Sequence, residues 1–158
     1  MRFLIMPAPW RRWASNCPSP IACSCANPSA VSISCAATTC LRAYRVALGL
    51  NPGGAKERAG DFRTPEGSYR LTRRNTRSDF FLSIQVSYPN DQDMRRARRN
   101  GWQPGGSIMI HGLPNDPRHS PDYYASQDWT DGCIAVTNAD MVEIWMMTSD
   151  NVRIDIQP

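Results

Sequence analysis

Two residues in the second half of the sequence have the types needed for nucleophilic chemistry, namely His111 and Cys133. A thiol is mostly protonated at neutral pH, and a neighbouring imidazole can take its proton or stabilise the thiolate that attacks a carbonyl. Glycine stands beside both, as Gly112 and Gly132. Gly132 lets the backbone turn so that amide N–H groups face a substrate oxygen, so we assign Gly132 and Cys133 to an oxyanion hole. The pattern predicts a cysteine acyl-transfer site.

Other roles for these residues remain open. A single buried thiol is common in protein cores, so Cys133 taken alone would be structural. His119 lies among prolines in a long loop, where it is expected to face solvent, although a His111–His119–Cys133 zinc site is an alternative. Five further cysteines near the start are the basis of another alternative, a metal-binding or disulfide-forming segment: Cys17, Cys23, Cys25, Cys35 and Cys40.

Three motifs resemble the signature of the YkuD-type L,D-transpeptidases. They are the pair His111-Gly112, the run Thr130-Asp131-Gly132-Cys133, and the upstream turn Thr64-Pro65-Glu66-Gly67. The resemblance covers roughly residues 41–158. It implies that Cys133 attacks the stem peptide of peptidoglycan and forms a thioester as a terminal D-Ala leaves. It further implies a location in the cell envelope or periplasm, and no metal or organic cofactor.

The resemblance also gives expectations for the neighbouring residues. The carbonyl of Gly112 orients the His111 ring, while Thr130 and Asp131 support the catalytic turn. Trp129 is a candidate substrate contact, with core packing as the alternative. Many family members have Arg two positions after the cysteine, where this chain has Ala135, so recognition of a substrate carboxylate is expected to differ.

Three functions stay open at this stage. An amine from a second stem peptide or from a lipoprotein would resolve the thioester in transfer. Water would resolve it in hydrolysis, either as a carboxypeptidase or by releasing a lipoprotein from peptidoglycan. The run Asp128-Trp129-Thr130-Asp131-Gly132-Cys133-Ile134-Ala135 resembles branches of the family related to lipoprotein attachment or its reversal, which makes hydrolysis a close alternative. A wall-binding module without activity is the third.

The elements that must position these residues are mostly short strands. The sequence predicts strands over 43–48, 68–71, 81–87, 107–111, 133–136 and 152–156. Apolar and polar residues alternate clearly in 81–87 and 152–156, whereas 107–111 has bulky side chains on both faces, as in a central strand. A polar surface helix is expected over 91–100, and a helix capped by Thr137 should follow the catalytic cysteine. Residues 113–128 are expected to form a loop beside the substrate. The fold class is therefore mainly β, and the resemblance implies packed mixed β-sheets, sandwich-like, with one or two short helices.

Size and composition limit the remaining possibilities. The 158 residues suffice for one catalytic domain, which we place at 41–158. Residues 1–40 show no sustained periodicity and are expected to be irregular, either signal-like or shifted in reading frame. The net charge is +4, and no basic run interleaved with aromatics indicates nucleic-acid binding. No stretch is apolar for long enough to predict a transmembrane segment.

Overall fold

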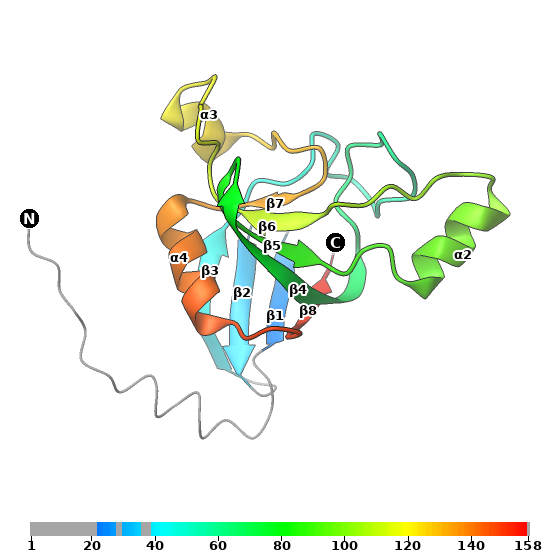
Figure 1. The fold of residues 1–158 in the computed structure, drawn as a ribbon, viewed down its shortest axis with the longest axis horizontal. Helices are drawn as coiled ribbons and strands as arrows, with labels where there is room; N and C mark the ends of the chain where they lie inside the picture. Colours follow the sequence, from blue (N-terminus) through cyan, green and yellow to red (C-terminus); the bar gives the residue numbers. More distant parts are fainter. Residues whose placement is uncertain (1–21, 28–29, 36–38, 158) are drawn as a thin grey trace, which may run out of the picture.

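The computed structural model describes residues 22–27, 30–35 and 39–157, with side-chain surroundings from residue 42 onward. The elements in chain order are β1 (Ala22–Asn27), β2 (Ala30–Cys35), β3 (Thr39–Arg45), β4 (Gly67–Ser78), β5 (Phe81–Val86), α2 (Asp91–Arg99), β6 (Met109–His111), α3 (Pro121–Ser126), β7 (Ile134–Ala135), α4 (Asn138–Met147) and β8 (Arg153–Ile156). Figure 1 shows their arrangement. None of the described helices has the length and apolar character needed to cross a membrane.

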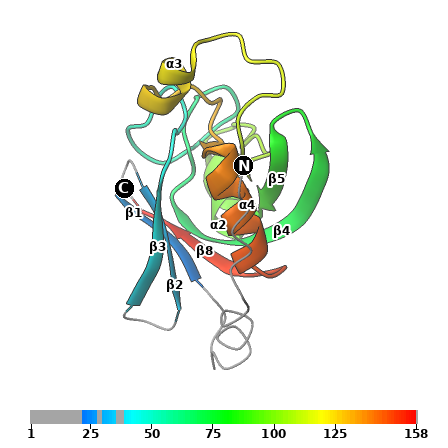
Figure 2. The same cartoon turned by 90° about the vertical axis from the view of Figure 1, so that its left-hand side faces the viewer.

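All eight strands belong to one mixed sheet, in the order β3-β2-β1-β8-β4-β5-β6-β7. Two neighbouring pairs are parallel, β1 with β8 and β6 with β7, and the others are antiparallel. The sheet curls until its ends meet, because Ala47, just after β3, exchanges two backbone hydrogen bonds of 2.9 Å with Ala135 in β7. Figure 2 shows α4 between the two halves of the curled sheet. The prediction of a mainly β fold with mixed sheet and short helices is confirmed.

The start of the chain differs from the sequence prediction. Residues 1–40 were expected to be irregular, yet β1, β2 and the first residues of β3 lie within that range. β1 pairs in parallel with β8, with Cys23 opposite Ile154 and Cys25 opposite Ile156. The boundary expected near residue 40 therefore falls inside a strand. Small Ser, Ala and Cys residues dominate β1 and β2, so the hydrophobic contrast that reveals a strand is weak there.

The core lies inside the curl, where β4, β5, β6 and β8 face α4. Met141 and Ile144 of α4 are fully buried, as the helical spacing predicts, whereas Val142 and Met146 remain exposed. Thr137 caps α4 as predicted, because its hydroxyl accepts a hydrogen bond from the Asp140 amide at 3.1 Å. A helix beginning immediately after β7 fixes the far end of the segment that carries Cys133.

Candidate functional site

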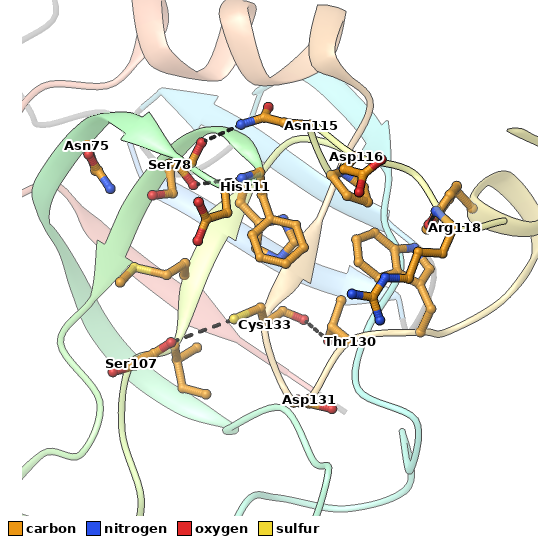
Figure 3. Close-up of a pocket in the computed structure, with 18 of the residues that line it drawn as sticks. Asn75, Ser78, Ser107, His111, Asn115, Asp116, Arg118, Thr130, Asp131 and Cys133 are labelled. Atoms are coloured by element: carbon orange, nitrogen blue, oxygen red, sulfur yellow. Dashed lines mark hydrogen bonds between the residues drawn. The ribbon is translucent and has the colours of Figure 1, made fainter.

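Cys133 and His111 line one open cleft of about 950 Å³ at the end of the curled sheet (Figure 3). Its walls come from four segments that are distant in sequence. These are the tip of the β4–β5 hairpin, residues 106–109 at the start of β6, the loop that contains α3, and residues 129–133. The two candidate catalytic residues therefore share a space large enough for a peptide.

Strand register brings these two side chains to the same face. β6 and β7 are parallel, with Ile110 opposite Ile134 and His111 opposite Ala135. Side chains alternate between faces along a strand, so Cys133, two residues before Ala135, lies on the same face as His111. Figure 3 shows both side chains directed into the cleft.

The His111 ring is held in one orientation. Its Nδ1 lies 2.7 Å from the Gly112 carbonyl oxygen, and the residue is only 4% exposed. A carbonyl only accepts hydrogen bonds, so Nδ1 carries the proton in the neutral ring and Nε2 has the free lone pair. Burial lowers the pKa of His111, and the bond to Gly112 opposes this shift. The imidazole is therefore neutral at pH 7 and able to accept a proton at Nε2.

Gly112 has no room for a side chain. A Cβ atom there would lie 2.5 Å from Oδ1 of Asn138, the first residue of α4, and 3.0 Å from Cβ of Phe81. The same Asn138 oxygen accepts a hydrogen bond from the Leu113 amide at 2.8 Å. Glycine thus lets α4 pack against the segment whose carbonyl orients His111.

Cys133 is held as a neutral thiol. Its Sγ donates to the carbonyl oxygen of Ser107 at 3.6 Å. Burial raises the pKa of the thiol; a backbone hydrogen bond from Met109 and the Lys56 ammonium lower this pKa, and the Asp131 carboxylate raises it. With the imidazole also neutral, the resting site is a thiol and a free base. The sequence alone is compatible with a thiolate stabilised by the imidazole, but burial disfavours that charged pair.

Hydrogen bonds within residues 130–133 define the turn that presents Cys133. The Thr130 hydroxyl donates to the Cys133 carbonyl at 2.7 Å and accepts from the Gly132 amide at 3.1 Å. Gly132 has a φ of 123°, and a Cβ atom there would lie 2.5 Å from the Arg63 carbonyl oxygen. Glycine is therefore required at this position for both conformation and space.

The geometry changes one assignment made from the sequence. Gly132 was expected to offer its amide to a substrate oxygen, but this amide already donates to Thr130. It is occupied within the turn and does not face the cleft as a free donor. Asp131 is exposed and lines the cleft beside Cys133. Thr130 and Asp131 both line the cleft near the thiol, and only Thr130 makes hydrogen bonds within the turn among the described contacts.

Trp129 belongs to a chain of aromatic rings that covers His111. Its ring lies 5.7 Å from that of His111 and 5.0 Å from that of Tyr124, measured between centroids. Phe80 packs on His111 from the hairpin, at 4.6 Å. Trp129 is partly buried, so it packs against the His111 ring and also lines the cleft. Both of the alternatives considered for Trp129 are compatible with this position.

Only one of the two alternative metal sites can be compared with the structure. Within the described residues, no three His, Cys, Asp or Glu side chains come close enough to hold a metal ion. His119 stacks on Tyr123 instead, with 4.2 Å between centroids, so the set His111–His119–Cys133 is not assembled. Cys17 lies outside the described residues, as do the side chains of Cys23, Cys25, Cys35 and Cys40.

Several residues of the site carry no signal in the sequence. Ser107 adopts a φ of 57°, which turns its carbonyl to the thiol, and only the preceding pair of glycines indicates an unusual backbone there. Phe80 reaches His111 because the Gly112 amide bonds to the carbonyls of Phe80 and Leu82, at 3.1 and 3.2 Å. Such long-range pairing cannot be read from local periodicity. The helix α3, in a segment predicted as loop, supplies Tyr123 and Tyr124.

Comparison with known proteins places this arrangement in a family. The model of the L,D-transpeptidase catalytic domain, YkuD, matches residues 35–156. The Escherichia coli K12 protein named "Putative L,D-transpeptidase YafK" is 30% identical over 111 residues, covering 69% of this chain and 37% of that protein. The chain thus spans little more than a third of the length of this relative.

Solved structures share the fold at lower identity. The helical cell shape determining protein Pgp2 from Campylobacter jejuni has a TM-score of 0.62 at 23% identity, over 87% of this chain and 46% of that one. Bd1075 from Bdellovibrio bacteriovorus has a TM-score of 0.62 at 20% identity, over 88% and 48%. An L,D-transpeptidase from Mycobacterium smegmatis has a TM-score of 0.56 at 13% identity, over 87% and 58%.

Proposed function

Because this chain belongs to the YkuD family of L,D-transpeptidase catalytic domains, we propose that it is a cysteine acyltransferase acting on peptidoglycan stem peptides in the cell envelope. The observation that carries the proposal is the shared face of β6 and β7. The register of these two strands directs the side chains of Cys133 and a neutral His111 into one cleft, and Nδ1 of His111 is hydrogen-bonded to the Gly112 carbonyl.

The first step is attack on the donor peptide. Cys133 Sγ attacks the carbonyl that precedes the terminal D-Ala of a tetrapeptide, and its proton passes to Nε2 of His111. The imidazolium that forms is stabilised by the Nδ1–H bond to the Gly112 carbonyl. The C–N bond then breaks, and the proton on Nε2 goes to the departing amine of D-Ala. The products of this step are a thioester on Cys133 and free D-Ala.

The second step releases the acyl group. An acceptor amine attacks the thioester carbonyl and gives a proton to Nε2 of His111. The C–S bond then breaks, the new amide is released, and the proton on Nε2 passes to the sulfur of Cys133. The amine belongs to a second stem peptide, as in crosslinking, or to a lipoprotein. If water attacks instead, the same residues perform hydrolysis.

The oxyanion of the tetrahedral intermediate needs a hydrogen-bond donor near Cys133. With the Gly132 amide bonded to Thr130, we assign this role to the backbone amide of Cys133 itself. Thr130 acts as a positioning residue, because it ties both ends of the turn through one hydroxyl. Trp129 borders the donor peptide from the side of His111.

Intact-mass measurement tests this proposal. The protein is incubated with a disaccharide tetrapeptide, and we expect an adduct equal to the donor minus D-Ala. Cys133→Ala should give no adduct, and Cys133→Ser provides a control of nearly equal size. Absence of both adduct and released D-Ala in the wild type would favour the wall-binding module without activity.

The products distinguish transfer from hydrolysis. With an added amine acceptor, a transferase gives a crosslinked product in proportion to the D-Ala released. A tripeptide formed in its place identifies a hydrolase that uses the same thioester. Both results are consistent with Cys133 as the nucleophile, but only the crosslinked product is consistent with transfer to an amine.

A further inference from the structure

The cleft around Cys133 contains more acidic than basic side chains. Asp79, Asp116 and Asp131 line it, against Arg77 and Arg118, and burial keeps His111 neutral. A donor peptide with a free carboxylate is therefore not drawn in by the general charge of the cleft. Ala135, buried at 2% exposure within the sheet, contributes no charge. Recognition of a carboxylate here needs a cation directed at it locally.

Arg118 is placed to provide that cation. Its guanidinium has no ion-pair or hydrogen-bond partner among the described residues, although the cleft holds three carboxylates. In Figure 3 the side chain extends from its loop toward Thr130 and the turn that carries Cys133. An unpaired guanidinium that points at a nucleophile is available to a substrate.

The backbone of Arg118 is anchored to the catalytic ring. Its amide donates to the Tyr124 hydroxyl at 3.1 Å, the Tyr124 ring packs on Trp129 at 5.0 Å, and Trp129 packs on His111 at 5.7 Å. This series of contacts fixes the distance between the loop and the site of attack. Arg77, near the tip of the β4–β5 hairpin, has no comparable link to His111 among the described contacts.

We propose that Arg118 binds the terminal carboxylate of the donor peptide and so selects peptides that end one residue beyond the attacked carbonyl. The inference rests on the proposed function, because it assigns part of the same substrate. A guanidinium binds a carboxylate through two parallel hydrogen bonds, which fixes orientation as well as charge. Substrates with an extended or blocked C-terminus lose this pair.

The test compares kcat/KM for a tetrapeptide with a free C-terminus and for the same peptide as its C-terminal amide. The wild type should prefer the free acid by about 10- to 100-fold, the usual value of a charged hydrogen-bond pair. Arg118→Gln should reduce this acid-to-amide ratio to nearly one, and Arg118→Lys should restore part of it. A ratio unchanged in Arg118→Gln would overturn the inference.

Arg77→Gln is the matched control, since it removes an equal charge from the same cleft. We expect it to change the acid-to-amide ratio by less than about two-fold, because the cleft field is screened and local pairing dominates. If both variants lower the acid-to-amide ratio equally, the preference comes from the overall charge of the cleft and Arg118 is not a specific carboxylate site. A third donor, amidated at another stem carboxylate, identifies the group that is bound. If kcat/KM falls on amidation of this other carboxylate, and the fall is absent in Arg118→Gln, then Arg118 does not bind the terminal carboxylate.

These outcomes separate the inference from the proposed function. A wild type that releases neither D-Ala from the free acid nor D-alaninamide from the amide contradicts the proposed function. A wild type that turns over the free acid, with the same ratio in Arg118→Gln, leaves the function standing and removes only the role of Arg118.

Discussion

At the scale of single residues, burial sets the chemistry of the pair. It raises the pKa of the Cys133 thiol and lowers the pKa of the His111 imidazole, so both groups rest uncharged. A neutral thiol is a weak nucleophile toward chance electrophiles. In the proposed mechanism, the proton moves when a substrate carbonyl lies against the sulfur and the negative charge can pass to the oxyanion. Reactivity thus depends on bound substrate more than on a standing thiolate.

Replacement of His111 tests this interpretation. We expect His111→Gln to lower kcat/KM by about 10²- to 10⁴-fold, the usual contribution of a general base. Alkylation of Cys133 by iodoacetamide should remain slow at neutral pH in both proteins and rise only above the ordinary thiol value of 9.0. Rapid labelling of the wild type at pH 7, lost in the variant, would instead indicate a thiolate–imidazolium pair.

The lowered pKa of His111 also predicts how stability depends on pH. The unfolded chain takes up a proton near the ordinary value of 6.5, whereas the folded chain does so only at lower pH. The unfolded state therefore binds more protons in this interval, and the free energy of unfolding falls as the pH drops below about 6.5.

Chemical denaturation at pH 7.5 and pH 5 measures this dependence. The difference in unfolding free energy between the two pH values should be smaller in His111→Gln than in the wild type, because the variant lacks this titration. An equal difference in the two proteins would show that His111 does not contribute to the acid sensitivity of the fold.

At the scale of elements, prediction succeeded where the signal is local. The alternating run that became β5, the cap Thr137 and the buried face of α4 all depend on neighbours within a few residues. The motifs around Cys133 and His111 are local in the same way, and the two residues they single out line one cleft. The rest depends on pairing across long separations. Phe80 meets His111 through sheet register, and α3 interrupts a segment rich in proline and polar residues.

Gly112 links the position of α4 to the orientation of the His111 ring. In Gly112→Ala the new Cβ meets Asn138 Oδ1 at 2.5 Å and must displace the start of α4 or the carbonyl that orients His111. We expect a loss of about 1 to 3 kcal/mol in stability and, since small misplacements of catalytic groups are costly, a fall in kcat/KM on the order of 10- to 100-fold. Thermal unfolding and donor turnover measure the two effects.

Gly106→Ala is the matched control for this substitution. Gly106 lines the same cleft, yet a Cβ atom there meets nothing within 4 Å. We expect both stability and turnover close to those of the wild type. Equal losses in the two variants would mean that the cleft is sensitive to any added methyl group, and not to the contact with α4.

At the scale of the whole molecule, the first strands are part of the same sheet as the site. β1 pairs with β8, and β8 with β4, whose partner β5 pairs with β6. The sequence predicted residues 1–40 to be irregular and placed the catalytic domain at 41–158. Because β1 and β2 consist mostly of small residues, their sequences show little alternation of apolar and polar side chains, and the strands are recognised only from their pairing in the sheet.

Deletion of residues 1–38 tests how far this segment supports the fold. It removes β1 and β2 and leaves edges of β3 and β8 unpaired. We expect a lower melting temperature and a greater tendency to aggregate than in a control that lacks only residues 1–20, measured by thermal unfolding and light scattering. Equal behaviour of the two deletions would support a domain that begins near residue 41.

The closure of the sheet holds the strand that follows Cys133 on both sides. β7 is two residues long and is held on one side by β6 and on the other by the backbone after β3. These two contacts hold the strand next to the turn with Cys133, so we expect this turn to be shaped only when the two ends of the sheet are joined. A chain in which the sheet has not closed has the thiol but lacks the turn that presents it to the cleft beside His111. Under the proposed function, a copy in which the sheet has not closed therefore has no assembled site for acyl transfer.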